Sequence, residues 1–195
     1  LTTLDLHDAI VMGHSMGGMI LGRFCGDYPE VLRERVAGLV FMDTAVSHLF
    51  PPGVDAVAAR FGKAVLARED AGARPPQVHP DLELLGTRLA FGRRPSGKAV
   101  QVTTRLGHDL AEEYRSKLWI DLYDTDNRDG LAKVTQPSTV IVGSRDTLTP
   151  VWAARRIVAN LRDAELLILP GAGHQCMQER PHEVVEALVD LEARI

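Results

Sequence analysis

Three short segments of the sequence carry residue types that together can perform acyl transfer. Ser15 lies in GHSMGG at positions 13–18, Asp146 lies in GSRDT at positions 143–147, and His174 ends GAGH at positions 171–174. A serine hydroxyl is a weak nucleophile at its ordinary pKa, so it needs a base, and that base is oriented in turn by an acid. The chain order Ser, Asp, His therefore predicts a catalytic triad with Ser15 as nucleophile, His174 as base and Asp146 as acid.

The glycines around Ser15 predict a tight turn from a strand into a helix. An apolar run precedes the motif and an amphipathic pattern follows it. Such a turn projects the serine hydroxyl into the site, and we expect side chains at Gly13 and Gly17 to collide across it. The turn also points the backbone N–H of Met16 at the place where an oxyanion develops. The alternative, a glycine-rich turn that binds phosphate, lacks the Gly-x-Gly-x-x-Gly or Lys-Ser/Thr signature.

The other candidate residues have structural interpretations as well. Asp146 also fits a turn or a helix cap, and a single loop histidine such as His174 is commonly structural. Asp43 is a rival acid, because a carboxylate at a neighbouring strand end can reach the same imidazole. His14 and Met16 flank the nucleophile, and we expect them to line the acyl pocket, with simple packing as the alternative.

The elements that must position these residues follow the pattern of a mostly parallel sheet flanked by helices. Apolar runs without strict alternation predict strands that are buried on both faces, at residues 9–12, 36–42, 139–142 and 165–169. Helical patterns follow, at residues 16–28, 151–160 and from Pro181 toward the C-terminus. The three candidate triad residues each follow a predicted strand, and open α/β sheets bind ligands at the carboxyl ends of their strands. The predicted class is therefore α/β.

One long stretch interrupts the alternation of strands and helices. Residues 48–118 contain six of the eleven prolines and no pattern of a buried strand. Helical patterns lie within it at residues 55–68, 81–91 and 98–114. We interpret residues 48–118 as an inserted helical lid, and residues 1–47 and 119–195 as the core of one domain.

Composition and charge exclude several classes of protein. Of the 195 residues 45% are hydrophobic and 25% are charged, which is typical of globular domains and not of disordered or fibrous chains. The net charge of -4, without a basic stripe, argues against a nucleic-acid partner. Because there is neither a membrane-length apolar run nor a signal-peptide pattern, we expect no membrane span and a cytoplasmic location. Cys25 and Cys176 have no metal-ligand spacing and are predicted to be buried free thiols. Acyl transfer by the predicted triad implies neither a metal nor an organic cofactor.

These motifs resemble those of the α/β-hydrolase superfamily. GHSMGG at positions 13–18, VGSRD at 142–146 and GAGH at 171–174 are similar to its nucleophile, acid and histidine motifs. The sequence is most similar to the cofactor-free haloperoxidase-like and monoacylglycerol-lipase-like esterases, and the resemblance covers almost everything outside the lid. A serine at position 15, rather than an aspartate, disfavours the haloalkane dehalogenase and epoxide hydrolase branches.

The resemblance implies that the chain is the C-terminal part of an α/β-hydrolase fold. Members of the superfamily have further strands and helices before the nucleophile, including a loop, often His-Gly, that supplies a second oxyanion N–H. The chain begins with Leu1 rather than Met, and its serine motif starts twelve residues later. We therefore expect the front of the sheet to be missing and the strand before Ser15 to lie at an exposed edge.

The expected activity is hydrolysis of a carboxylic ester in a small-molecule acyl substrate, through an acyl-enzyme on Ser15. Two alternatives within the enzyme class use the same triad: hydrolysis of a carbon–carbon bond, and acyl transfer to an acceptor other than water. From a different class, the alternative is a non-catalytic truncated hydrolase or a partner-binding remnant of one.

Overall fold

The computed structural model describes residues 1–47, 60, 79–108 and 126–195. The chain divides into two compact units. The first contains Leu1–Ser47, Ala90–Arg93 and Asp126–Ile195, and the second contains His48–Leu89 and Arg94–Thr125. Apart from residue 60, the helix predicted at residues 55–68 lies outside the described residues. The end of the helix predicted at 98–114 and the expected lid boundaries at 48 and 118 also lie outside them.

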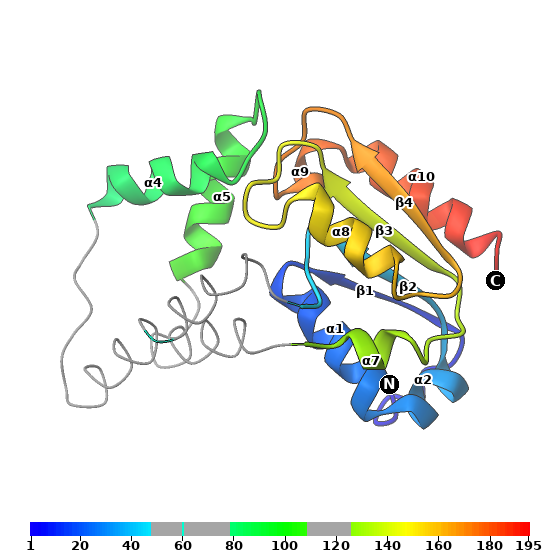
Figure 1. Ribbon diagram of the computed structural model, residues 1–195. Helices are drawn as coiled ribbons and strands as arrows, with labels where there is room; N and C mark the ends of the chain where they lie inside the picture. Colours follow the sequence, from blue (N-terminus) through cyan, green and yellow to red (C-terminus); the bar gives the residue numbers. More distant parts are fainter. Residues whose placement is uncertain (48–59, 61–78, 109–125) are drawn as a thin grey trace. The chain divides into compact units, whose positions relative to one another are not determined.

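The first unit is built on a four-stranded parallel sheet with the strand order β1-β2-β3-β4 (Figure 1). The strands are β1 (Ala9–His14), β2 (Val36–Met42), β3 (Ser138–Gly143) and β4 (Ala164–Leu169). Every neighbouring pair is parallel, so all four carboxyl ends lie at one edge of the sheet. The prediction of four parallel strands is confirmed, and in the described part of the chain β1 pairs only with β2.

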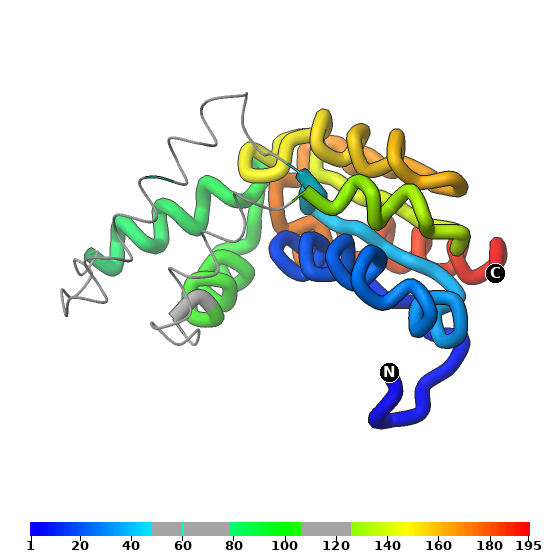
Figure 2. Tube along the Cα trace, turned by 60° about the horizontal axis from the view of Figure 1, so that its bottom comes forward, coloured from blue at the N-terminus to red at the C-terminus, as the bar shows by residue number. Residues whose placement is uncertain are grey.

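Helices cover both faces of this sheet (Figure 2). One face carries α1 (Met16–Asp27), α2 (Pro29–Arg35), α7 (Arg128–Leu131) and α8 (Val151–Val158), and the other carries α9 (Cys176–Glu179) and α10 (Pro181–Glu192). The predicted helices α1, α8 and α10 are confirmed. The sequence pattern missed α2 because Pro29 was interpreted only as the end of α1, although proline also suits the first turn of a new helix.

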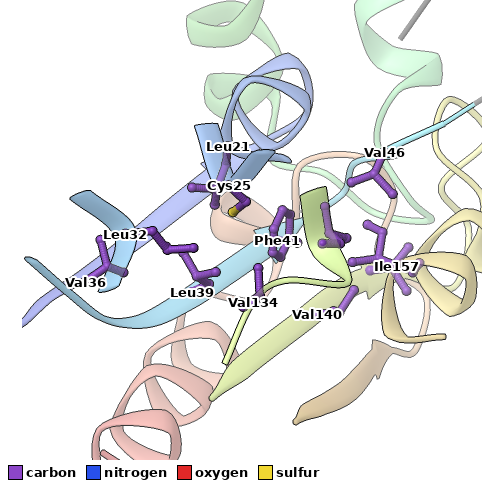
Figure 3. Packing of buried hydrophobic residues seen from close by; sticks show 13 residues of the cluster. Leu21, Cys25, Leu32, Val36, Leu39, Phe41, Val46, Val134, Val140 and Ile157 are labelled. Carbon is purple, nitrogen blue, oxygen red and sulfur yellow. The ribbon is translucent and has the colours of Figure 1, made fainter. Parts of the chain in front are cut away.

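The core consists of one cluster on each face of the sheet. Leu39 and Phe41 of β2 point toward α1 and pack there with Leu21 and Cys25 (Figure 3). Their neighbours on the strand point the opposite way and pack against α9 and α10. Because β2 and β3 are covered on both sides, their sequences lack a strict alternation of apolar and polar residues. This packing fixes the strand ends that carry the candidate site.

In the second unit, the described helices are α4 (Pro80–Leu89) and α5 (Gly97–His108), which contact each other. They correspond to the helical patterns predicted at 81–91 and 98–114. Phe91, which the sequence pattern included in the first of these helices, is buried in the first unit. Within the described ranges, no helix is both long and apolar enough to cross a membrane. A cytoplasmic location stays a prediction.

Candidate active site

Ser15 lies on the sharp turn between β1 and α1. Its backbone has φ 52° and ψ -122°, a conformation that residues other than glycine rarely adopt. Neighbouring groups hold this turn in place. The Ser15 N–H donates to the carbonyl of Met42 at the end of β2 (3.1 Å), and the Thr44 hydroxyl donates to the carbonyl of Ser15. Hydrogen bonds with the end of the neighbouring strand and with the residues after it therefore stabilise the strained backbone of Ser15. A nucleophile on a strand-to-helix turn needs such support.

The two glycines of the Gly-x-Ser-x-Gly motif have different roles. A Cβ atom on Gly13 would lie 2.5 Å from the carbonyl oxygen of Gly17 and 2.6 Å from the Cα of Gly18, both backbone atoms. The expected collision at Gly13 is confirmed. At Gly17 the expectation is wrong, since a Cβ built there meets no described atom within 4 Å beyond its chain neighbours and the backbone of its own helix. Gly17 lies in the first turn of α1, where an added Cβ has open space.

This difference leads to a prediction about stability. Gly13→Ala should lower the free energy of unfolding by about 3 kcal/mol or more, because backbone atoms cannot rotate away from the added methyl group. Gly17→Ala is the matched control, and it should be neutral or add about 0.5 to 1 kcal/mol because alanine is favoured over glycine in a helix. Urea unfolding of both variants measures the two values. Equal destabilisation by the two substitutions would contradict this account of the turn.

The structure brings Ser15, His174 and Asp146 together in one chain of hydrogen bonds. The Ser15 Oγ lies 2.8 Å from Nε2 of His174, and Nδ1 of the same ring lies 2.9 Å from Oδ2 of Asp146. A carboxylate only accepts, so Nδ1 carries the proton and Nε2 is free to accept from the serine hydroxyl. Asp146 and His174 are both buried, and Ser15 is half-buried. The arrangement can remove a proton from Ser15 and stabilise the imidazolium that results.

Asp146 is fixed by a partner that sequence reasoning missed. Its Oδ1 accepts the N–H groups of Leu148 and Thr149 at 2.8 and 2.9 Å, and its Oδ2 accepts the Thr149 hydroxyl at 2.6 Å. Burial alone would raise the pKa of Asp146, but the hydrogen bonds from His174 and Thr149 outweigh it and lower this pKa below its ordinary value. Asp146 is therefore charged at neutral pH. In turns, aspartate side chains commonly accept N–H groups of the residues that follow them. The aspartate at position 146 was therefore a signal for this turn that could be found in the sequence.

His14 contacts the backbone of the histidine loop. Its Nε2 lies 2.8 Å from the carbonyl oxygen of His174, and the two imidazole rings are 5.1 Å apart. Burial lowers the pKa of His14, so the neutral ring donates its Nε2–H to that carbonyl. This contact favours a role in holding His174, and lining of the acyl pocket stays a prediction for His14 and Met16. Met16 is the first residue of α1, where backbone N–H groups have no partner within the helix.

Asp43, the rival acid, bonds to groups other than the imidazole of His174. Its Oδ1 accepts the Gly143 N–H, and its Oδ2 accepts the Cys176 N–H, each at 3.0 Å. The Cys176 thiol also donates to this carboxylate at 3.2 Å. Burial raises the pKa of Asp43 to about 6. Asp43 thus joins the end of β3 to the start of α9, and so it connects the two segments that carry Asp146 and His174.

The remaining polar candidates do not form a metal centre in the described part of the chain. No group of three or more His, Cys, Asp or Glu side chains described there is placed to hold a metal ion. Cys25 and Cys176 are both free and buried, as predicted. Burial raises the pKa of Cys25 to about 12, and burial together with Asp43 raises the pKa of the Cys176 thiol further, so both thiols are uncharged.

A parallel sheet with the nucleophile on a strand-to-helix turn defines the class of α/β hydrolases, and comparison with known proteins agrees. The model of the Alpha/beta hydrolase family matches residues 1–187. The chain therefore belongs to the α/β-hydrolase family, as its motifs predicted.

Two curated relatives are similar over most of this chain. A Synechocystis protein named for non-heme chloroperoxidase activity is 29% identical over 185 residues, which cover 89% of this chain and 63% of the relative. A monoacylglycerol lipase of Xenopus laevis is 23% identical over 192 residues, which cover 92% of this chain and 53% of the lipase. The chain thus spans between half and two thirds of the length of these relatives.

Solved structures show the same fold. An esterase from Exiguobacterium antarcticum superimposes with a TM-score of 0.77 at 21% identity, covering 97% of this chain and 68% of the esterase. A bromoperoxidase from Bacillus anthracis gives a TM-score of 0.78 at 19% identity, covering 99% of this chain and 70% of that structure. At these identities the likeness concerns the fold alone.

Proposed function

We propose that this protein is a serine hydrolase that cleaves carboxylic esters through an acyl-enzyme on Ser15. The observation that carries the proposal is the position of the His174 imidazole, with Nε2 2.8 Å from the Ser15 Oγ and Nδ1 2.9 Å from Asp146. The name of one curated relative, a monoacylglycerol lipase, supports the same substrate class. The substrate is a small molecule with an acyl group.

In the first half of the reaction, the Ser15 Oγ attacks the ester carbonyl carbon while Nε2 of His174 takes the hydroxyl proton. The carbonyl oxygen becomes an oxyanion, and the N–H of Met16 donates to it at the start of α1, where the helix dipole favours negative charge. The imidazolium is stabilised by the charged Asp146. It then protonates the departing alcohol, which leaves the acyl group bound to Ser15.

In the second half, His174 removes a proton from water, and the resulting hydroxide attacks the acyl carbonyl. The tetrahedral intermediate collapses, His174 returns the proton to the Ser15 Oγ, and the carboxylic acid leaves. Hydrolysis of a carbon–carbon bond and acyl transfer to another acceptor would use the same residues. The assembled geometry of the triad favours a catalytic protein over a non-catalytic remnant. The strained backbone of Ser15 costs stability, and strain of this kind is typical of functional sites.

Fluorophosphonate labelling of the full-length protein tests the proposal. The probe reacts with a serine whose hydroxyl is activated by a base, so peptide mass spectrometry should locate a single adduct on Ser15. The heat-denatured protein should give no adduct, since unfolding separates Ser15 from His174. An unlabelled native protein, or labelling that persists at the same rate in Ser15→Ala, would overturn the proposal.

A further inference from the structure

A short segment far from His174 in the sequence lies against the loop that carries this residue. Residues Ala90–Arg93 belong to the same compact unit as the sheet, although the chain on either side of them belongs to the other unit. The His174 N–H donates to the carbonyl of Ala90 at 2.6 Å, and the Arg93 N–H donates to the carbonyl of Gly171 at 3.2 Å. The backbone of His174 is therefore bonded directly to this segment.

The carboxylate of Glu179 joins the same two segments a second time. Its Oε2 accepts the Gly92 N–H, and its Oε1 accepts the Gly173 N–H, each at 2.8 Å. Glu179 is the last residue of α9, five residues after His174, and it is partly buried. Hydrogen bonds to a charged carboxylate are roughly twice as strong as neutral ones. One side chain thus fixes the residue before His174 and the segment that holds the His174 N–H.

The two backbones approach each other so closely that only glycine fits. A Cβ on Gly92 would overlap with the carbonyl oxygen of Gly171, and a Cβ on Gly173 would lie 2.5 Å from the N of Gly92 and from the carbonyl carbon of Phe91. All three are backbone atoms that cannot rotate away. Phe91, between these contacts, is 4% exposed, so its side chain is almost completely buried. The contact is tightly packed and polar groups within it are paired.

We propose that Glu179 is a positioning residue for His174, which acts by clamping the Ala90–Arg93 segment against the histidine loop. The proposal rests on the function proposed above, because it assigns His174 the role of base. Its physical basis is the rigidity of the loop. The imidazole can hold Nε2 at 2.8 Å from the Ser15 Oγ only if the backbone of residues 173 and 174 stays in place. Glu179 fixes that backbone without contacting the reacting atoms.

The clamp should act on the rate of the chemical step and not on substrate binding. A displacement of about 1 Å at a catalytic group can cost about 100-fold in rate. Glu179→Gln keeps the size of the side chain but places an amide N–H₂ against one of two backbone N–H donors. Glu179→Asp keeps the charge but is one methylene shorter, so it cannot reach both donors. Both variants should lower kcat by about 10- to 100-fold and leave KM within about twofold.

Glu183→Gln is the matched control. This variant also removes one negative charge from a glutamate. Glu183 lies in α10, where its Oε1 is 3.7 Å from Nε of Arg180 in a partly exposed ion pair. Because Glu183 lies outside the clamp, this variant should keep the wild-type kcat. The experiment measures kcat and KM for an activated ester, together with the rate of fluorophosphonate labelling, in all four full-length proteins. Circular dichroism verifies that each is folded.

Each outcome decides the proposal. A lower kcat and slower labelling in both Glu179 variants, at unchanged KM and with Glu183→Gln at the wild-type rate, supports it. Wild-type kcat in the Glu179 variants, or a change in KM alone, overturns it while the proposed function stands. Failure of both variants to fold also overturns it, because the carboxylate would then serve the fold as a whole. If the wild-type protein is not labelled, the proposed function falls, and the assignment of Glu179 falls with it.

Discussion

Ser15→Ala is expected to lower kcat for ester hydrolysis by about 10⁶-fold, the largest effect of any single substitution in this protein. The variant lacks the Ser15 Oγ, which lies 2.8 Å from His174 Nε2 and is the proposed nucleophile, so no acyl-enzyme forms. A residual acceleration of about 10³- to 10⁴-fold over water should remain, because substrate binding and the oxyanion contact survive. Stopped-flow or long-time assays of the full-length protein with p-nitrophenyl acetate measure the loss.

A control substitution makes this result specific to the nucleophile. Ser96→Ala removes another hydroxyl, one that accepts a local hydrogen bond from the Ala99 N–H at 3.0 Å. It should leave kcat unchanged. The unfolding free energy of Ser15→Ala should be equal to or higher than that of the wild type, since the strained turn loses a polar group that serves chemistry and not stability. A kcat for Ser15→Ala within tenfold of the wild-type value would show that another group is the nucleophile.

Asp146→Asn should lower kcat by about 10⁴-fold with little change in KM. The substitution keeps the shape of the side chain, but an amide cannot stabilise the imidazolium of His174 and its N–H₂ favours the wrong ring tautomer. Asp43→Asn is the comparison, because Asp43 bonds to Gly143 and Cys176 and should affect mainly stability, by about 1.5 to 3 kcal/mol for bonds to a charged group. Steady-state kinetics of both variants separates the two acids. If Asp43→Asn had the larger effect on kcat, the assignment of Asp146 as the acid would be wrong.

The pH dependence of stability gives a second test of Asp146. Its pKa is lowered in the folded protein, so its charged form adds stability at pH values above the pKa it has when unfolded. That stability is lost as the pH falls through the lower folded pKa. The difference in unfolding free energy between the wild type and Asp146→Asn should therefore be constant near neutral pH and shrink below about pH 4. A difference that does not change with pH would contradict the charged state of Asp146.

The elements with a strong local pattern were predicted well from the sequence. The strands β2 and β3 are covered on both faces, so their apolar runs have clear ends and were located to within a residue. The short helices α2, α7 and α9 were missed. A helix of seven residues or fewer gains most of its stability from tertiary contacts, such as the burial of Leu32 in α2 and of Leu131 in α7, and not from its own sequence.

The candidate site was predicted only in part, because only some of its residues lie beside a strong local pattern. Ser15, Asp146 and His174 follow apolar strands, so their types and chain order identify them. Their partners Thr149 and Glu179 carry no such signal, since neither follows a strand. One of the two groups that Glu179 binds, the Gly92 N–H, is 87 residues away in the chain. Contacts of that separation do not follow from local patterns.

The sequence by itself determined the class of fold, the three residues of the candidate triad and the glycine that the turn at Ser15 requires, because each follows from strand-end chemistry or local backbone sterics. Only the tertiary structure decided which carboxylate faces the imidazole. It placed Asp146 on Nδ1 of His174 and turned Asp43 toward Cys176 instead. Both acids lie at the same edge of the sheet, so the direction of each side chain separates their roles. The direction of Asp146 is set in part by its close neighbours Leu148 and Thr149. Asp43 is instead oriented by Gly143 and Cys176, which are 100 and 133 residues away in the chain, and no local pattern encodes contacts of that separation.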